Sequence, residues 1–173
     1  VCGFGRGNLN DSMMESISNN GNGNYEYIST EDDMTKVFVN ERSEFFAVAN
    51  DAKIQITFDA AKIDSYRLIG YENRVLSNED FENDEKDAGE IGAGQTITAL
   101  YEIIPVAEET ASEGPLAVFD FRYKKTLGAE SIPLTLDVTM PEEVSSEFDF
   151  AAGVAAYGMI LRDSPYKGNA DFD

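Results

Sequence analysis

The sequence contains no histidine, no tryptophan and a single cysteine. The absence of histidine excludes Ser-His-Asp and Cys-His nucleophile systems, HExxH zinc sites and histidine proton shuttles. One cysteine excludes an intramolecular disulfide and a cysteine-rich metal site. Because Cys2 lies in an apolar segment, we expect a small buried side chain there rather than a reactive thiol. The remaining chemistry is that of carboxylates, lysine and tyrosine, so we expect no catalytic residues and no cofactor.

Basic residues are also scarce. Thirteen Lys and Arg stand against 33 Asp and Glu, which gives a formal net charge of −20. Phosphate backbones and anionic bilayers repel such a surface, and binding them requires clustered Lys and Arg. The sequence contains no run of 18 apolar residues that could span a membrane. We therefore expect neither nucleic acid nor a membrane as a partner, and the simplest role of the charge is solubility.

Residues 1–50 follow a strand–helix–strand–helix order. The strands are expected at 1–5 and 24–28, and the helices at 10–19 and from Thr30 to about Ala49. Such a unit builds a parallel sheet, and two parallel strands do not form a domain by themselves. We expect residues 1–50 to be the closing half of a larger α/β sheet. The edge of strand 1–5 would then pair with another chain, as in a homodimer, or be disordered.

From Asp51 the hydrophobic period changes from helical to alternating, which predicts a domain boundary at about residues 49–52. Five antiparallel strands are expected over 53–59, 64–72, 94–104, 115–124 and 131–140. Pro133 predicts an edge position for the fifth strand. One face of that strand is expected in the core, with the residues Ile132, Leu134, Leu136, Val138 and Met140. Residues 51–173 are therefore predicted to form a β-sandwich-like domain.

A final helix is predicted over residues 146–162, with Ser145 or Ser146 as its cap. It is apolar nearly all round, so we expect it to be buried on more than one side. The expected fold class is α+β. A truncated β-α-β-α half is followed by an antiparallel β-sandwich-like domain with a buried C-terminal helix.

The segment from Ser77 to Ile91 is rich in acidic residues. Calcium binding requires several converging carboxylate and carbonyl oxygens, which such a segment can supply. The order of an EF-hand is not met, because Glu85 stands where glycine is required and Ile91 where the last acid is required. The simpler interpretation is a solvated hairpin loop whose charge opposes aggregation. The candidate cation ligands are Asp80, Glu82, Asp84 and Asp87.

Two further patterns have little specificity. A glycine-rich turn, Gly3-x-Gly5-x-Gly7, follows the first strand, but Asn8 occupies the place of the third glycine of the dinucleotide fingerprint. A chain with 33 acids also offers many carboxylate pairs. A carboxylate-based hydrolase therefore stays open as a less favoured alternative, and it requires two inward-facing acids in one pocket.

Several segments resemble the C-terminal part of bacterial von Willebrand factor type A (VWA) lipoproteins. These segments are 1–11, 21–25, 66–74, 87–94 and 161–168. Residues 1–50 are similar to the last two strand–helix units of the VWA domain, and residues 51–173 to the domain appended to it. VWA domains bind Mg²⁺ through a DxSxS loop and later Thr and Asp residues, all on the first half of that domain. The resemblance therefore places no metal ligand on this chain.

The resemblance implies an exported, cell-envelope lipoprotein in its full-length form, with a role in protein interaction or adhesion. We therefore expect a non-enzymatic interaction module. Its expected partners are a protein ligand and its own VWA domain. A calcium-stabilised β binding module is the alternative, and the carboxylate-based hydrolase is a weaker one.

Overall fold

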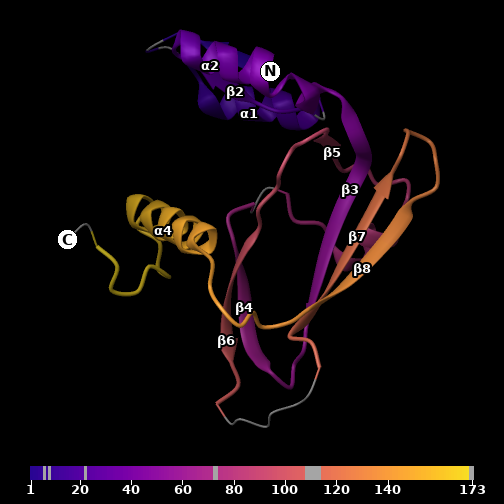
Figure 1. The fold of residues 1–173 in the computed structure, drawn as a ribbon, viewed down its shortest axis with the longest axis vertical. Coiled ribbons are helices and arrows are strands. Elements are labelled where there is room, and N and C mark those ends of the chain that lie inside the picture. Colours follow the sequence, from indigo (N-terminus) through magenta and orange to yellow (C-terminus); the bar gives the residue numbers. More distant parts are fainter. Residues whose placement is uncertain (6, 8, 22, 72–73, 108–113, 172–173) are drawn as a thin grey trace. The chain divides into compact units, whose positions relative to one another are not determined.

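The computed structural model describes residues 1–5, 7, 9–21, 23–71, 74–107 and 114–171. The chain is a mixture of helices and strands with antiparallel pairing, as expected of the α+β class (Figure 1). By their contacts the residues group into two units. The first comprises Val1–Ile56, Leu76–Ile97 and Phe119–Leu136, and the second Thr57–Val75, Thr98–Val118 and Asp137–Asp173. The domain boundary predicted at residues 49–52 lies within a strand and stays a prediction.

The N-terminal elements have the predicted order: β1 (Cys2–Phe4), α1 (Asp11–Asn20), β2 (Glu26–Ile28) and α2 (Glu31–Thr35). β1 and β2 are parallel, with Gly3 opposite Tyr27. Asn10 caps α1 by accepting a hydrogen bond from the Met13 backbone N–H. β1 is therefore ordered and paired within the chain, and a partner on its outer edge stays a prediction. Cys2 is half-buried, and Asn8 and Asn22 lie outside the described residues.

The second helix ends earlier than predicted. α2 stops at Thr35, and one π-helical turn (Lys36–Asn40) and one 3₁₀ turn (Arg42–Phe45) follow it. β3 (Ala47–Phe58) then begins, so the helix predicted to reach Ala49 was wrong at its end. Two causes act together: Phe46 and Val48 favour an extended chain, and the Phe46 carbonyl accepts a hydrogen bond from the Ala93 N–H, which is distant in the sequence.

The larger sheet has the order β5-β3-β7-β8, with β5 at Gly89–Gly92, β7 at Ala117–Lys124 and β8 at Ile132–Val138. β3 and β5 are antiparallel, with irregular register on both sides of Ala49. Asp51 lies in that irregular stretch and has a φ of 48°. β8 is an edge strand, so the position predicted from Pro133 is confirmed.

The acidic segment is more structured than a solvated loop. It contains a short helix, α3 (Asn78–Glu82), whose start is capped by Ser77, and it ends in β5. The strand predicted over 94–104 begins only at Leu100, as β6 (Leu100–Pro105), and it pairs antiparallel with β4 (Ile63–Ile69). Phe58 contacts both ribbon strands, with ring centroids 4.5 Å from Tyr66 and 5.5 Å from Tyr101. The face-to-face packing that a sandwich requires stays a prediction.

Two predictions of burial were wrong. The C-terminal helix forms as α4 (Ser146–Leu161), with Ser145 as its cap, but none of its residues is buried. On β8 the apolar row Leu134, Leu136 and Val138 is exposed. An apolar pattern indicates that a side chain gains by burial, but it does not indicate which surface buries it. The buried apolar side chains are instead Ile28, Val37, Ala49, Ile63, Phe81 and Ala117.

None of the helices in the described part of the chain has the length and apolar character needed to cross a membrane.

Candidate interaction surface

A buried ion pair joins β3 to β7 in the first unit. Lys124 Nζ lies 2.7 Å from Asp51 Oδ2, and the two side chains are only 8% and 9% exposed. Lys124 also donates to the Asp84 carbonyl at 2.6 Å, and Asp51 accepts from the Ala88 N–H at 3.2 Å. Burial opposes ionisation of Asp51. The Lys124 ammonium and the Ala88 N–H outweigh it and hold the pKa of Asp51 below its ordinary value.

Lys53 is the second buried cation of this region, and the sequence pattern placed it on the polar face of its strand. Its ammonium donates to the Asp80 carbonyl at 3.1 Å and to the Asn83 carbonyl. Lys53 is buried while Ile54 is exposed, so the predicted faces are reversed at this point of β3. Burial lowers the pKa of Lys53. The side that carries Lys53 is covered here by the acidic segment, whose Asp80 and Asn83 carbonyls accept hydrogen bonds from its ammonium.

Asp84 holds the acidic segment against β7 and the start of β8. Ser131 Oγ donates to Asp84 Oδ1 at 2.5 Å, and the Ser131 N–H donates to Oδ2 at 3.3 Å. Arg122 donates to Oδ1 at 3.1 Å. The Ser131 hydrogen bonds, assisted by Arg122, lower the pKa of Asp84 to about 2.

The four cation candidates do not converge. The Asp84 carboxylate binds protein donors, and the Asp80 carboxylate lies 3.5 Å from the Lys86 ammonium. Asp87 is exposed in the segment between α3 and β5, and Glu82 is exposed at the end of α3. Within the described ranges, no group of three or more acidic or cysteine residues has the arrangement to hold a metal ion. The charged groups of this region instead hold the acidic segment to β3 and β7. We call them the clamp; its members are Asp51, Lys53, Asp84, Arg122 and Lys124.

One feature of the sequence does indicate this clamp, although the alternating strand pattern did not reveal it. Asp51 and Lys53 are two residues apart on β3, and Arg122 and Lys124 are two apart on β7. Residues two apart on a strand share a face, so each strand presents a charged pair on one side. Two neighbouring strands with such pairs can neutralise each other, but their adjacency is known only from the fold.

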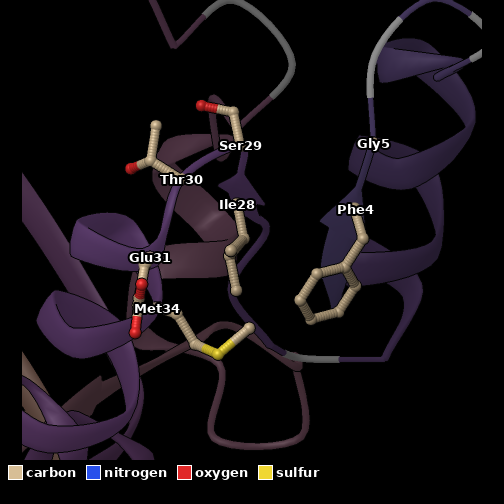
Figure 2. Close-up of a pocket in the computed structure, with 7 residues that line it drawn as sticks. All are labelled: Phe4, Gly5, Ile28, Ser29, Thr30, Glu31 and Met34. Carbon is tan, nitrogen blue, oxygen red and sulfur yellow. The ribbon is translucent and has the colours of Figure 1, made fainter.

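A shallow pocket of about 410 Å³ lies at the carboxyl ends of β1 and β2. Figure 2 shows the side chains of Phe4, Ile28 and Met34 pointing toward one another in it. Among the described residues that line it, Glu31 is the one acid. The N–H groups of Ser29 and Thr30 already donate to the Asp33 carboxylate, at 3.0 and 2.9 Å, so they are satisfied by the capping box.

In the second unit Arg67 of β4 contacts β6, α4 and the tail beyond α4. It pairs with Glu102 of β6, and its guanidinium carbon lies 4.2 Å from the centre of the Tyr166 ring. Its Nη2 lies 3.5 Å from the Met159 sulfur near the end of α4. Arg67 thus fixes the C-terminal end of α4 and the tail beyond it to the β4–β6 ribbon.

Among the described residues, large apolar side chains are more often exposed than buried. On β8, Leu134, Leu136 and Val138 project on one side of an edge strand, and Leu136 is 63% exposed. On α4 the exposed set is Phe148, Phe150, Val154, Tyr157 and Leu161. Exposed apolar patches of this kind mark interaction sites in native proteins.

These features define an acidic α+β protein whose acidic segment is held by buried charges and whose β8 and α4 carry exposed apolar side chains. Residues 43–173 match the sequence profile of the family described as "Uncharacterized protein YfbK, C-terminal". The chain is also 39% identical over 191 residues to the uncharacterized protein YfbK of Escherichia coli (strain K12). That alignment covers 98% of this chain and 33% of the relative, so the chain spans about a third of the relative's length. No solved structure matches the chain. The chain belongs to the YfbK C-terminal family.

Proposed function

We propose that this chain is a non-enzymatic protein-interaction module of the adhesion type. The observation that carries the proposal is the exposed apolar row Leu134, Leu136 and Val138 on the edge strand β8. An edge strand presents unpaired backbone groups, and native proteins usually protect such edges with charges or a covering element. A partner that adds a strand there would gain both backbone hydrogen bonds and apolar contacts.

The module accompanies a VWA-like domain in a bacterial cell-envelope protein. The parallel pair β1–β2 with its two helices supports this proposal, because it has the form of a strand–helix unit at the end of an α/β sheet. The outer edge of β1 would then pair with the preceding strand of the same domain, or with a second copy in a homodimer. The full-length protein is proposed to be an exported lipoprotein whose metal site lies on the VWA residues outside this chain.

A catalytic role receives little support from the geometry. The hydrolase alternative requires two acids at a catalytic separation in one pocket, whereas Glu31 is the one acid among the described residues that line the pocket at β1 and β2. The ionisable groups that do converge, around Asp51 and Lys124, bind one another and the backbone. Their partners give them a structural role.

The proposal is tested by affinity capture with the full-length protein and with the same protein lacking residues 51–173. Quantitative mass spectrometry of the captured proteins should show at least one partner that is lost with the deletion. Circular dichroism of the shortened protein should confirm that its remaining domain is folded. An identical set of captured proteins would contradict the proposal.

A further inference from the structure

We infer that the attachment of β5 to β3 is a pH-sensitive latch, closed when the Glu90 carboxyl carries its proton and loosened when that carboxyl ionises. When β5 leaves, the edge of β3 from Ala47 to Ala52 loses its paired strand and can accept another. The latch lies in the first unit, and it is independent of the β8 surface on which the proposed function rests.

The Glu90 side chain lies in a place that suits a neutral acid better than a carboxylate. Its Oε2 atom is buried, and no described residue donates a hydrogen bond to it. Arg122 Nε, the other buried side-chain atom of the described chain without a partner, lies on β7, and β3 separates that strand from β5. A buried carboxylate oxygen without a donor costs free energy, whereas a protonated carboxyl has no net charge to solvate. The closed position of Glu90 therefore favours the proton.

Two neighbouring carboxylates also oppose the ionisation of Glu90. The register places Asp51 of β3 across from it, and Asp87 precedes it in the segment that leads into β5. Burial, Asp87 and Asp51 together raise the pKa of Glu90 above its ordinary value of 4.5. A hydrogen bond from its own backbone N–H favours the ionised form but does not outweigh these causes.

The cations of the surrounding elements do not offset the two carboxylates. On β3, the 3₁₀ turn, the acidic segment and β7 these cations are Lys53, Arg42, Lys86, Arg122 and Lys124. Lys53 and Lys124 donate to backbone carbonyls of the acidic segment, and Lys124 also pairs with Asp51. The 3₁₀ turn carries an acid, Glu44, as well. In the described part of the chain, no ammonium or guanidinium forms an ion pair with Glu90.

The raised pKa of Glu90 fixes the sign of the pH dependence. An acid of this kind stabilises the folded state fully below its unfolded pKa. The contribution is lost as pH rises through the folded pKa. The latch is therefore closed on the acid side of this range and loosened on the alkaline side.

The loosening is confined to β5 by the way the acidic segment is held. β5 has four residues at the edge of its sheet, and its register on β3 shifts on both sides of Ala49. Residues 80–84 are held by Lys53 and Lys124 through backbone carbonyls, which do not titrate. A short edge strand opens at a lower free energy than the whole domain, so β5 leaves while the clamped residues stay in place.

The experiment measures hydrogen exchange of the full-length protein between about pH 4 and about pH 8, corrected for the pH dependence of exchange itself. Protection of the Gly89–Gly92 amides should fall at least about threefold across this range in the wild type. It should stay constant in Glu90→Gln, which carries no charge at any pH. Glu82→Gln, which removes an exposed charge from the same segment, is the control and should follow the wild type. Protection of β7 should stay constant in all three proteins.

A second variant tests the cause of the effect. Asp87→Asn removes one of the two neighbouring charges, so the loss of protection should move to lower pH. An unchanged position in that variant would overturn the inference.

Four other results would also overturn it. They are protection of Gly89–Gly92 that is independent of pH in the wild type, a pH response that persists in Glu90→Gln, a response that Glu82→Gln abolishes, and an equal loss of protection in β7. The last result would mean that the opening is global and not confined to β5.

Discussion

Lys124 Nζ lies 2.7 Å from Asp51 Oδ2 on the neighbouring strand, with both side chains more than nine-tenths buried. Replacing Lys124 by Met leaves the Asp51 carboxylate buried without its cation. We predict that Lys124→Met lowers the free energy of unfolding by about 3–5 kcal/mol, measured by urea denaturation. Lys125→Met, at the exposed neighbouring position, is the control and should change stability little. Equal midpoints for the two variants would show that the pair does not stabilise the fold.

The double variant Asp51→Asn/Lys124→Met tests whether the loss of stability in Lys124→Met comes from the unpaired buried carboxylate. Removing both charges leaves no uncompensated ion, so its loss of stability should be smaller than that of Lys124→Met alone. A double variant that is less stable than Lys124→Met would contradict this account of the clamp.

Gly92 allows the 3₁₀ turn to approach β5. A Cβ atom at Gly92 would lie 1.9 Å from the Glu44 carbonyl oxygen and 2.6 Å from its Cα, and these backbone atoms cannot move aside without shifting the turn. We predict that Gly92→Ala destabilises the fold by about 1–3 kcal/mol in chemical denaturation. Gly89→Ala is the matched control on the same strand, because nothing lies within 4 Å of its Cβ position. Similar losses for both variants would refute the steric explanation.

The Asp84 clamp predicts a dependence on pH. The folded pKa of Asp84 is about 2, below its ordinary value of 3.8. A depressed pKa means that the stabilisation is present above the unfolded value and is lost as pH falls through the folded one. The stability difference between the wild type and Asp84→Asn should therefore shrink as pH falls from about 4 to about 2. Asp137→Asn, an exposed substitution on β8, is the control, and its stability should change with pH as that of the wild type does. A stability difference between the wild type and Asp84→Asn that does not change with pH would contradict the prediction.

Calcium is predicted not to stabilise the chain. The Asp84 carboxylate already accepts hydrogen bonds from Ser131 and Arg122, and the Asp80 carboxylate forms an ion pair with Lys86. A thermal melt in millimolar Ca²⁺ should give the same Tm as a melt in EDTA, because an ion that does not bind the native state cannot shift its stability. A Tm that rises with Ca²⁺ concentration would favour the calcium-stabilised alternative.

Features determined by nearby residues could be predicted from the sequence. The caps Thr30 and Ser145, the edge position of Pro133 and the strands near 115–124 and 131–140 follow from local chemistry and alternation. β5 was missed because its acidic surroundings resemble a loop and its pairing partner, β3, is some 40 residues away in the chain.

The buried clamp could not be predicted because its partners are distant in sequence. Lys53 is held by carbonyls 27 and 30 residues away, and Asp84 by Arg122, 38 residues away. For α4 the sequence predicted the helix and its Ser145 cap correctly, because both are local properties. The burial predicted for this helix was wrong, because burial depends on tertiary packing and not on the local pattern.

The most direct test of the interaction account places charges on the exposed row of β8 in the full-length protein. Leu134→Asp/Leu136→Asp is compared with Leu127→Asp/Glu130→Gln, whose substitutions lie in the loop before β8. The account predicts that affinity capture with the β8 variant loses a protein that the wild type and the control both retain, while the unfolding midpoint of each variant stays close to that of the wild type. Capture of the same proteins in the same amounts by all three would contradict it.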